Sequence, residues 1–172
     1  RGITLDDFKL DRMRYSAVIR EFELIGEAVG SLADTVKENY PHIDVVAGNV
    51  SEGSAAIELL NAGADGIVVG QGPGSACKSR QVKGTGLRLA TAVYQCVRAT
   101  EQLDIPLGAD GGLWHPADLV KVFAIGASYG ILGRRFAGTD ESPGEVVEDE
   151  ETGLRKKKYR GMTRSAILRA LA

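Results

Sequence analysis

Residues 65–80 read DGIVVGQGPGSACKSR, and this stretch decides the fold class. It begins with a short apolar run, which is suited to a strand covered on both faces in a parallel sheet. A loop with several glycines follows directly and ends in a cysteine and two basic residues. Because glycine has no Cβ, such a loop can bring its backbone close to a ligand. The combination is typical of the carboxyl end of a strand in an α/β enzyme, where reactive groups gather.

The same order of strand, turn and helix occurs four times after Pro41. We expect strands at residues 44–47, 65–69, 106–109 and 129–132. We expect helices from Glu52 to Asn61 with Ser51 as its cap, from Leu89 to Leu103, and from Pro116 to Gly126. Four such units make half of an eightfold barrel, and a complete one needs about 250 residues. The predicted fold class is therefore α/β, the carboxyl half of a TIM (β/α)8 barrel over residues 44–172.

A helical segment is predicted before this half-barrel, over residues 1–43. Three of the 22 glycines lie there, so its composition differs from that of the rest of the chain. Apolar residues recur at helical spacing on one face, at Val18, Phe22, Ile25, Val29 and Leu32. We therefore expect a domain boundary near residue 43.

The composition excludes several classes of protein. Lys and Arg total 21 against 23 Asp and Glu, and the net charge of -2 argues against a nucleic-acid binder. Glycine makes up 22 of 172 residues, or about 13%, where about 7% is usual. Two cysteines, no leader and no long apolar run indicate a reducing compartment and no membrane association, and we expect the cytoplasm.

The cysteine loop contains the first candidate for chemistry. Cys77 follows a predicted strand end, and loop amides together with Lys78 or Arg80 would favour its thiolate, which is the nucleophilic form. The alternative is that the cysteine is an inert small apolar residue. That interpretation fits Cys96, which falls inside an apolar helix.

Two further strand ends carry polar or glycine-rich groups. Asp110 precedes a pair of glycines, and its carboxylate could accept hydrogen bonds from both hydroxyls of a ribose. Amides near Gly112 and Gly133 could hold a phosphate. The alternative is that these glycines only serve the turns. A last feature is the run of opposite charges in residues 145–158, which predicts a charged hairpin that is either a solvated excursion or a lid.

Five stretches together resemble the inosine-5'-monophosphate dehydrogenase and guanosine-5'-monophosphate reductase family. They lie within residues 44–163 and are Ala47-Gly48-Asn49-Val50, the cysteine loop, Asp110-Gly111-Gly112, FAGTDESPGE at residues 136–145, and Tyr159-Arg160-Gly161-Met162. The resemblance implies a (β/α)8 barrel in which Cys77 attacks C2 of a purine nucleotide, while hydride moves to or from NAD or NADP.

The resemblance also implies a role for each matched residue. The implied catalytic residues are Cys77 and Ser79, the latter at a position where the family has a threonine. A purine 5'-monophosphate would bind at Ser75, Asp110, Gly112, Gly133, Tyr159, Gly161 and Met162. Of these, Asp110 would hold the ribose, the residues near the base would be Gly161 and Met162, and the phosphate would lie at Ser75, Gly112 and Gly133. A potassium ion would be bound by the backbone carbonyls of Gly72, Gly74 and Cys77.

The dehydrogenase branch of the family is favoured over the reductase branch. Residues 141–145 (ESPGE) and Arg160 resemble the dehydrogenases, whereas the reductase pattern has a glutamate at the position of Ser165. Arg134 stands where the family has a small residue beside the phosphate. Two alternatives remain open: a GMP reductase, and a catalytically silent remnant that binds purine nucleotides and associates through its helical segment.

The first 43 residues resemble the start of the HEPN-type helical toxin proteins, through residues 11–20, residues 25–29 and Tyr40-Pro41. The arginine and histidine motif of those ribonucleases is absent, so we expect a chimeric or truncated gene product instead of a ribonuclease. An open half-barrel exposes sheet edges and an apolar face. The expected partner is therefore a second copy of the chain or a complementary half-barrel.

Overall fold

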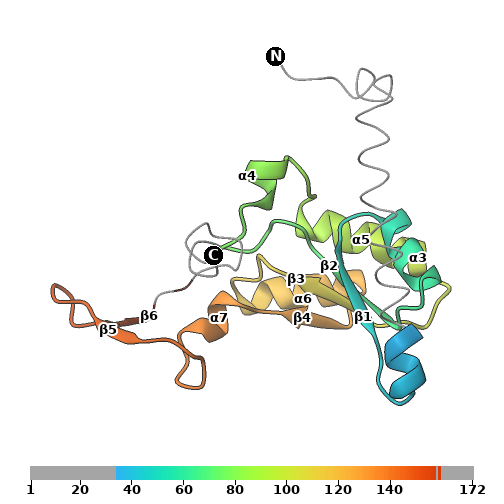
Figure 1. The fold of residues 1–172 in the computed structure, drawn as a ribbon. Helices are drawn as coiled ribbons and strands as arrows, with labels where there is room; N and C mark the ends of the chain where they lie inside the picture. The colour runs from blue at the N-terminus through green and yellow to red at the C-terminus, as the bar shows by residue number, and fades with distance from the viewer. Residues whose placement is uncertain (1–33, 158, 160–172) are drawn as a thin grey trace.

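A parallel sheet of four strands forms the centre of the protein, in the order β1-β2-β3-β4 (Figure 1). The structure is a computed structural model and describes residues 34–157 and 159. The strands are β1 (Val46–Val50), β2 (Gly66–Val69), β3 (Leu107–Asp110) and β4 (Tyr129–Ile131). Because all neighbouring strands pair in parallel, their carboxyl ends meet at one edge of the sheet. The predicted α/β class is confirmed, and the sheet fits part of a TIM-barrel-like fold.

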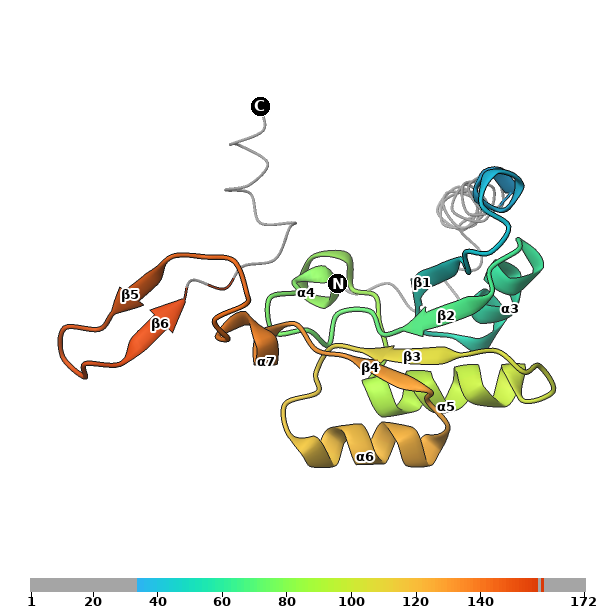
Figure 2. The same ribbon diagram turned by 90° about the horizontal axis from the view of Figure 1, so that it is seen from below.

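Helices lie between successive strands, and the three longer ones pack against the sheet. They are α3 (Gly53–Asn61), α4 (Ser79–Lys83), α5 (Leu89–Thr100), α6 (Pro116–Ile125) and α7 (Arg134–Ala137). Helix α5 packs between α3 and α6, and Figure 2 shows α5 and α6 side by side on one face of the sheet. The helix of residues 34–39 precedes the sheet, and Lys37 Nζ donates a 2.8 Å hydrogen bond to Asp65 Oδ1.

The core lies between the central strands and α5. Ile67 and Val69 of β2 are fully buried, as are Val93 and Cys96 of α5. Ile67 and Val69 point to the same face of β2, and the helices packed on that face exclude solvent from them, so apolar residues are required there. The interpretation of Cys96 as a packed core residue is consistent with this burial.

Several predicted boundaries differ from the structure by one to three residues, and one predicted cap is wrong. Strand β1 begins at Val46, two residues later than expected, because the Val45 amide donates to Asp65 Oδ2 at 2.9 Å instead of joining the ladder. Helix α5 ends at Thr100, not Leu103. Ser51 does not cap α3, since its hydroxyl lies 3.3 Å from Gln71 Oε1.

The end of the predicted helix at residues 116–126 is confirmed. Pro116 is the first residue of α6, and Gly126 follows the helix with a left-handed φ of 117°. The His115 amide donates to Asp118 Oδ2 at 2.9 Å, which satisfies one of the free amides at the helix start. Among the described residues, none of the helices has both the length and the apolar character needed to cross a bilayer.

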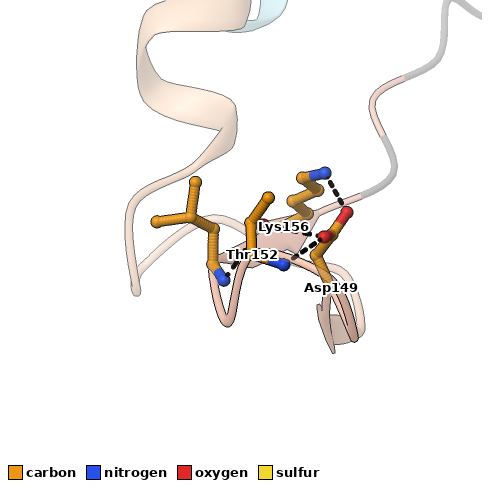
Figure 3. A network of polar contacts seen from close by, with 4 residues as sticks. Asp149, Thr152 and Lys156 are labelled. Carbon is orange, nitrogen blue, oxygen red and sulfur yellow. Dashed lines mark hydrogen bonds and ion pairs between the residues drawn. The ribbon is translucent and has the colours of Figure 1, made fainter.

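The charged segment forms the hairpin that the sequence predicts, with β5 (Val146–Glu148) antiparallel to β6 (Arg155–Lys157). Figures 1 and 2 both show that it projects away from the sheet. Asp149 closes its turn by accepting from the Thr152 amide at 2.9 Å and the Thr152 hydroxyl at 2.7 Å, and it pairs with Lys156 (Figure 3). The bond from Lys156 is the main cause of the lowered pKa of Asp149.

Several predictions concern residues outside the described part of the chain. They are the amphipathic helix over residues 18–32, the HEPN-like residues 11–20 and 25–29, and the positions of Arg160, Gly161, Met162 and Ser165. The domain boundary near residue 43 therefore stays a prediction.

Candidate functional site

The carboxyl ends of three strands are joined by one asparagine. Asn49 Nδ2 lies 2.7 Å from Asp110 Oδ2 and 2.9 Å from the carbonyl oxygen of Gly70. The three residues come from β1, from the end of β3 and from the loop after β2. This amide therefore holds the Asp110 carboxylate in a fixed orientation at the edge of the sheet.

Asn49 reaches this position because the ladder of β1 is irregular there. The pairing with β2 shifts between Gly48 and Val50, so Asn49 stands outside the regular register. Gln71 Nε2 in turn donates to the carbonyl oxygen of Asn49 at 2.8 Å. Asn49 lies in one of the five stretches that carry the family resemblance, but no role was predicted for it from the sequence. A polar side chain at a strand end was the signal that could have identified it.

Cys77 lies in an exposed loop beside this edge. Its Sγ is 3.2 Å from Ser79 Oγ, and the Cys77 amide donates to the carbonyl of Gly74 at 3.0 Å. The hydrogen bond with the Ser79 side chain is the main cause of a lowered pKa of the Cys77 thiol, to which the Ser79 amide and the charge of Arg80 contribute. A lowered pKa increases the fraction of nucleophilic thiolate at neutral pH.

Cys96 provides the contrast within the same chain. Its side chain is fully buried in α5, and this desolvation raises the pKa of the thiol to about 11. The two cysteines therefore differ in both access and ionisation.

Two open clefts meet at Asp110. The first is lined by every predicted substrate residue within the described part of the chain, namely Ser75, Asp110, Gly112, Gly133 and Tyr159. The second is lined by Gly72, Gly74, Cys77 and Ser79 together with Asn49 and Asp110. The structure thus brings the implied substrate residues and the implied catalytic residues to adjoining surfaces.

The first cleft has aromatic walls and a positive charge. Trp114 and Tyr159 both line it, and the Tyr159 hydroxyl lies over Gly133. The Arg134 guanidinium carbon lies 4.8 Å from the centre of the Trp114 ring, a cation–π contact that holds the charge at the cleft. The arrangement suits a flat ring together with an anionic group.

The implied potassium ligands are neutral backbone oxygens, which is the donor type that binds this ion. Gly72, Gly74 and Cys77 lie in one tight loop, in which the Gly74 carbonyl already accepts one hydrogen bond and keeps a second lone pair. The donor set therefore fits a monovalent cation.

Comparison with known proteins assigns the family. The model of the IMP dehydrogenase / GMP reductase domain matches residues 24–170. The chain belongs to the IMP dehydrogenase / GMP reductase family. The resemblance found from residues 44–163 is confirmed, and the family match also extends into the predicted helical segment.

Relatives of this family are similar over most of the chain. The inosine-5'-monophosphate dehydrogenase of Chlorobaculum tepidum is 46% identical over 136 residues, which cover 79% of this chain and 27% of that protein. The enzyme of the same name from Aquifex aeolicus is 44% identical over 129 residues, 75% of this chain and 26% of its own length. The one from Mycobacterium bovis is 40% identical over 162 residues, 94% of this chain and 30% of that protein. The chain therefore spans less than a third of these relatives.

Proposed function

We propose that this chain carries the purine-nucleotide site and the cysteine nucleophile of an IMP dehydrogenase-like oxidoreductase. The observation that carries the proposal is the position of Cys77, whose exposed thiol lies beside the cleft that contains Asp110. Membership of the IMP dehydrogenase / GMP reductase family supports the same chemistry. The relatives named above are dehydrogenases, which favours that direction over the reductase direction.

The substrate in this proposal is a purine 5'-monophosphate, IMP in the dehydrogenase direction. Asp110 accepts hydrogen bonds from the ribose hydroxyls while Asn49 holds its carboxylate. The phosphate lies near Ser75, Gly112 and Gly133, where Arg134 adds a positive charge. The base extends towards Cys77, with Tyr159 and, further along the chain, Gly161 and Met162 on its other side.

The chemical step begins with the Cys77 thiolate. Its sulfur forms a bond to C2 of the purine, and the hydrogen on C2 departs with its electron pair, which leaves a covalent thioimidate on the enzyme. When bound, NAD or NADP supplies the hydride acceptor. The thiol donates to Ser79 Oγ at 3.2 Å, and once the thiol has ionised the Ser79 hydroxyl turns to donate to the sulfur and so stabilises the thiolate before attack. Water then cleaves the carbon–sulfur bond, which returns the thiol and releases the oxidised nucleotide.

The same loop would hold potassium on the carbonyl oxygens of Gly72, Gly74 and Cys77. This ion would fix the loop that carries the nucleophile and take no part in bond making. The charge-neutral donors and the tight turn that ends at Cys77 support this assignment.

We further propose that the sheet is completed by other segments, either from a second copy or from a complementary half-barrel. Within the described residues, β1 and β4 each pair on one side only, and their residues Val46 and Ile131 are 48% and 37% exposed. Unpaired edges and exposed apolar side chains favour association. The cytoplasm is the proposed compartment, because an active thiol needs reducing conditions.

Competitive alkylation tests the proposed function. Iodoacetamide should label Cys77 much faster than Cys96, as read by peptide mass spectrometry, and IMP should protect Cys77. Cys77→Ser should abolish hydride transfer and leave IMP binding largely intact, because the nucleophile acts at the chemical step. Cys96→Ser is the matched control and should keep both the labelling of Cys77 and its protection.

Two results would contradict the proposal. Equal labelling of both cysteines without protection by IMP would rule out Cys77 as the nucleophile. Protection without any hydride transfer in the assembled protein would instead support the silent nucleotide binder.

A further inference from the structure

Cys77 lies in a long excursion of the chain, residues 72–86, between β2 and α5. This segment, here called the cysteine excursion, contains the short helix α4 and stands away from the sheet in Figure 1. It contributes no residue to the buried core. Its shape must therefore depend on polar contacts at its base, where Gln71 enters it and Leu87 leaves it.

One side chain spans this base. Arg80 Nε donates to the carbonyl oxygen of Gln71 at 3.1 Å, and Arg80 Nη2 donates to the carbonyl oxygen of Leu87. Leu87 packs against the core, and the Gln71 side chain donates to Asn49 of β1. The guanidinium therefore ties both ends of the cysteine excursion to fixed parts of the sheet.

The backbone around Arg80 is built to admit it. A Cβ on Gly72 would lie 2.4 Å from Arg80 Cγ, and a Cβ on Gly86 would lie 3.2 Å from Arg80 Nε. Both glycines have left-handed φ values, 82° and 115°, which other residues rarely adopt. The stem of Arg80 thus occupies the space that two missing side chains leave open.

The chemistry of the contact requires arginine. A guanidinium presents several N–H donors in a planar fork, so one side chain can bond two carbonyls that face it from different directions. A lysine ammonium at the same position carries the same charge on a compact group and could bond only one of the two carbonyls at a time.

We propose that Arg80 is a positioning residue that clamps the base of the cysteine excursion and thereby holds Cys77 and Ser79 at the cleft. The inference rests on the proposed function, because it concerns the reactivity of the proposed nucleophile. Arg80 lines neither of the two clefts that meet at Asp110. Arg80 acts through α4. Ser79 and Arg80 are the first two residues of that helix, and Ser79 is two positions after Cys77.

The test measures alkylation of Cys77 by iodoacetamide in the full chain, at one fixed pH and one fixed potassium concentration. Arg80→Met removes the charge and the fork, and Arg80→Lys keeps the charge alone. Arg88→Met is the matched control, because it removes an exposed arginine just beyond the base of the excursion. Hydrogen exchange of residues 72–86 is followed in the same samples.

Both Arg80 variants should react at least about tenfold more slowly than the unaltered protein, because each loses at least one charge-assisted hydrogen bond at the base of the excursion. Arg88→Met should react at the original rate. Exchange should rise in residues 72–86 and stay unchanged in β2 and β3. Wild-type rates in Arg80→Lys would show that charge alone suffices and would overturn the clamp.

Three other results separate the possible failures. If exchange also rises in β2 and β3 in both variants, Arg80 supports the whole fold and the positioning role is wrong. If Cys77 of the unaltered protein reacts no faster than Cys96, the proposed function fails. If it reacts quickly and both Arg80 variants match it, only the clamp fails.

Discussion

Replacing Asp110 by alanine should weaken the binding of IMP without unfolding the protein. Asp110 ends β3 at the point where the two clefts meet, and its carboxylate is held by Asn49 at 2.7 Å. In the proposed complex the carboxylate accepts hydrogen bonds from the ribose hydroxyls. The variant loses these bonds and leaves the hydroxyls without this acceptor, while the Asn49 amide keeps only its bond to the Gly70 carbonyl.

The magnitude follows from the hydrogen bonds lost. Leaving the partner of a charged hydrogen bond unsatisfied costs about 1–3 kcal/mol. At about 1.4 kcal/mol for each tenfold change, the dissociation constant for IMP should rise about 5- to 150-fold. Asp110→Asn keeps one acceptor oxygen, so the rise in its dissociation constant should lie towards the lower end of that range.

The single tryptophan of the chain provides the assay. Trp114 lines the same cleft as Asp110, so its fluorescence should respond when IMP binds. Titrations of the unaltered protein, Asp110→Ala and the exposed control Asp104→Ala would give the three dissociation constants, with circular dichroism to check folding. An unchanged constant in a folded Asp110→Ala variant would refute the placement of the ribose.

Three further outcomes are expected. Ile67→Ala should lower the free energy of unfolding by about 2–5 kcal/mol in urea denaturation, because the fully buried side chain leaves a cavity beneath the sheet; a loss below about 1 kcal/mol would mean that the core collapses around it. Arg134→Met should weaken IMP about fivefold and inosine hardly at all, while the exposed control Arg98→Met on α5 should spare both, and an equal loss for the two ligands would place Arg134 away from the phosphate. The bond from Lys37 lowers the pKa of Asp65, so its contribution to stability is present above about pH 4 and is lost as the pH falls through the lowered pKa. Replacing Asp65 by asparagine should therefore lower the free energy of unfolding by less than about 1 kcal/mol at neutral pH. It should also weaken the fall of that free energy as the pH drops below about 4, and a steeper fall would contradict this.

The sequence was sufficient wherever a signal is local. The apolar run ending at Val69 predicted β2, and Pro116 and Gly126 predicted the limits of α6 almost to the residue. The different surroundings of Cys77 and Cys96 along the chain also distinguished an exposed loop thiol from a packed one. Proline and glycine restrict the backbone at their own positions, and buried strands need apolar residues whatever surrounds them.

These local signals could not predict contacts between residues that are far apart in the sequence. Asn49 and Asp110 are 61 positions apart, and only the parallel sheet and the irregular register of β1 bring them together. The same limit explains why Ser51 fits a helix cap by its position yet faces Gln71 in the structure.

The sequence by itself determined that this protein is an α/β chain with a glycine-rich loop that carries a cysteine after a strand, because periodicity and loop composition are properties of neighbouring residues. Only the tertiary structure decided that Arg80 spans Gln71 and Leu87 and that two clefts share Asp110. Those arrangements depend on how strands and loops pack in three dimensions. A hydrogen bond needs its partners within about 3 Å, and that proximity is created by packing.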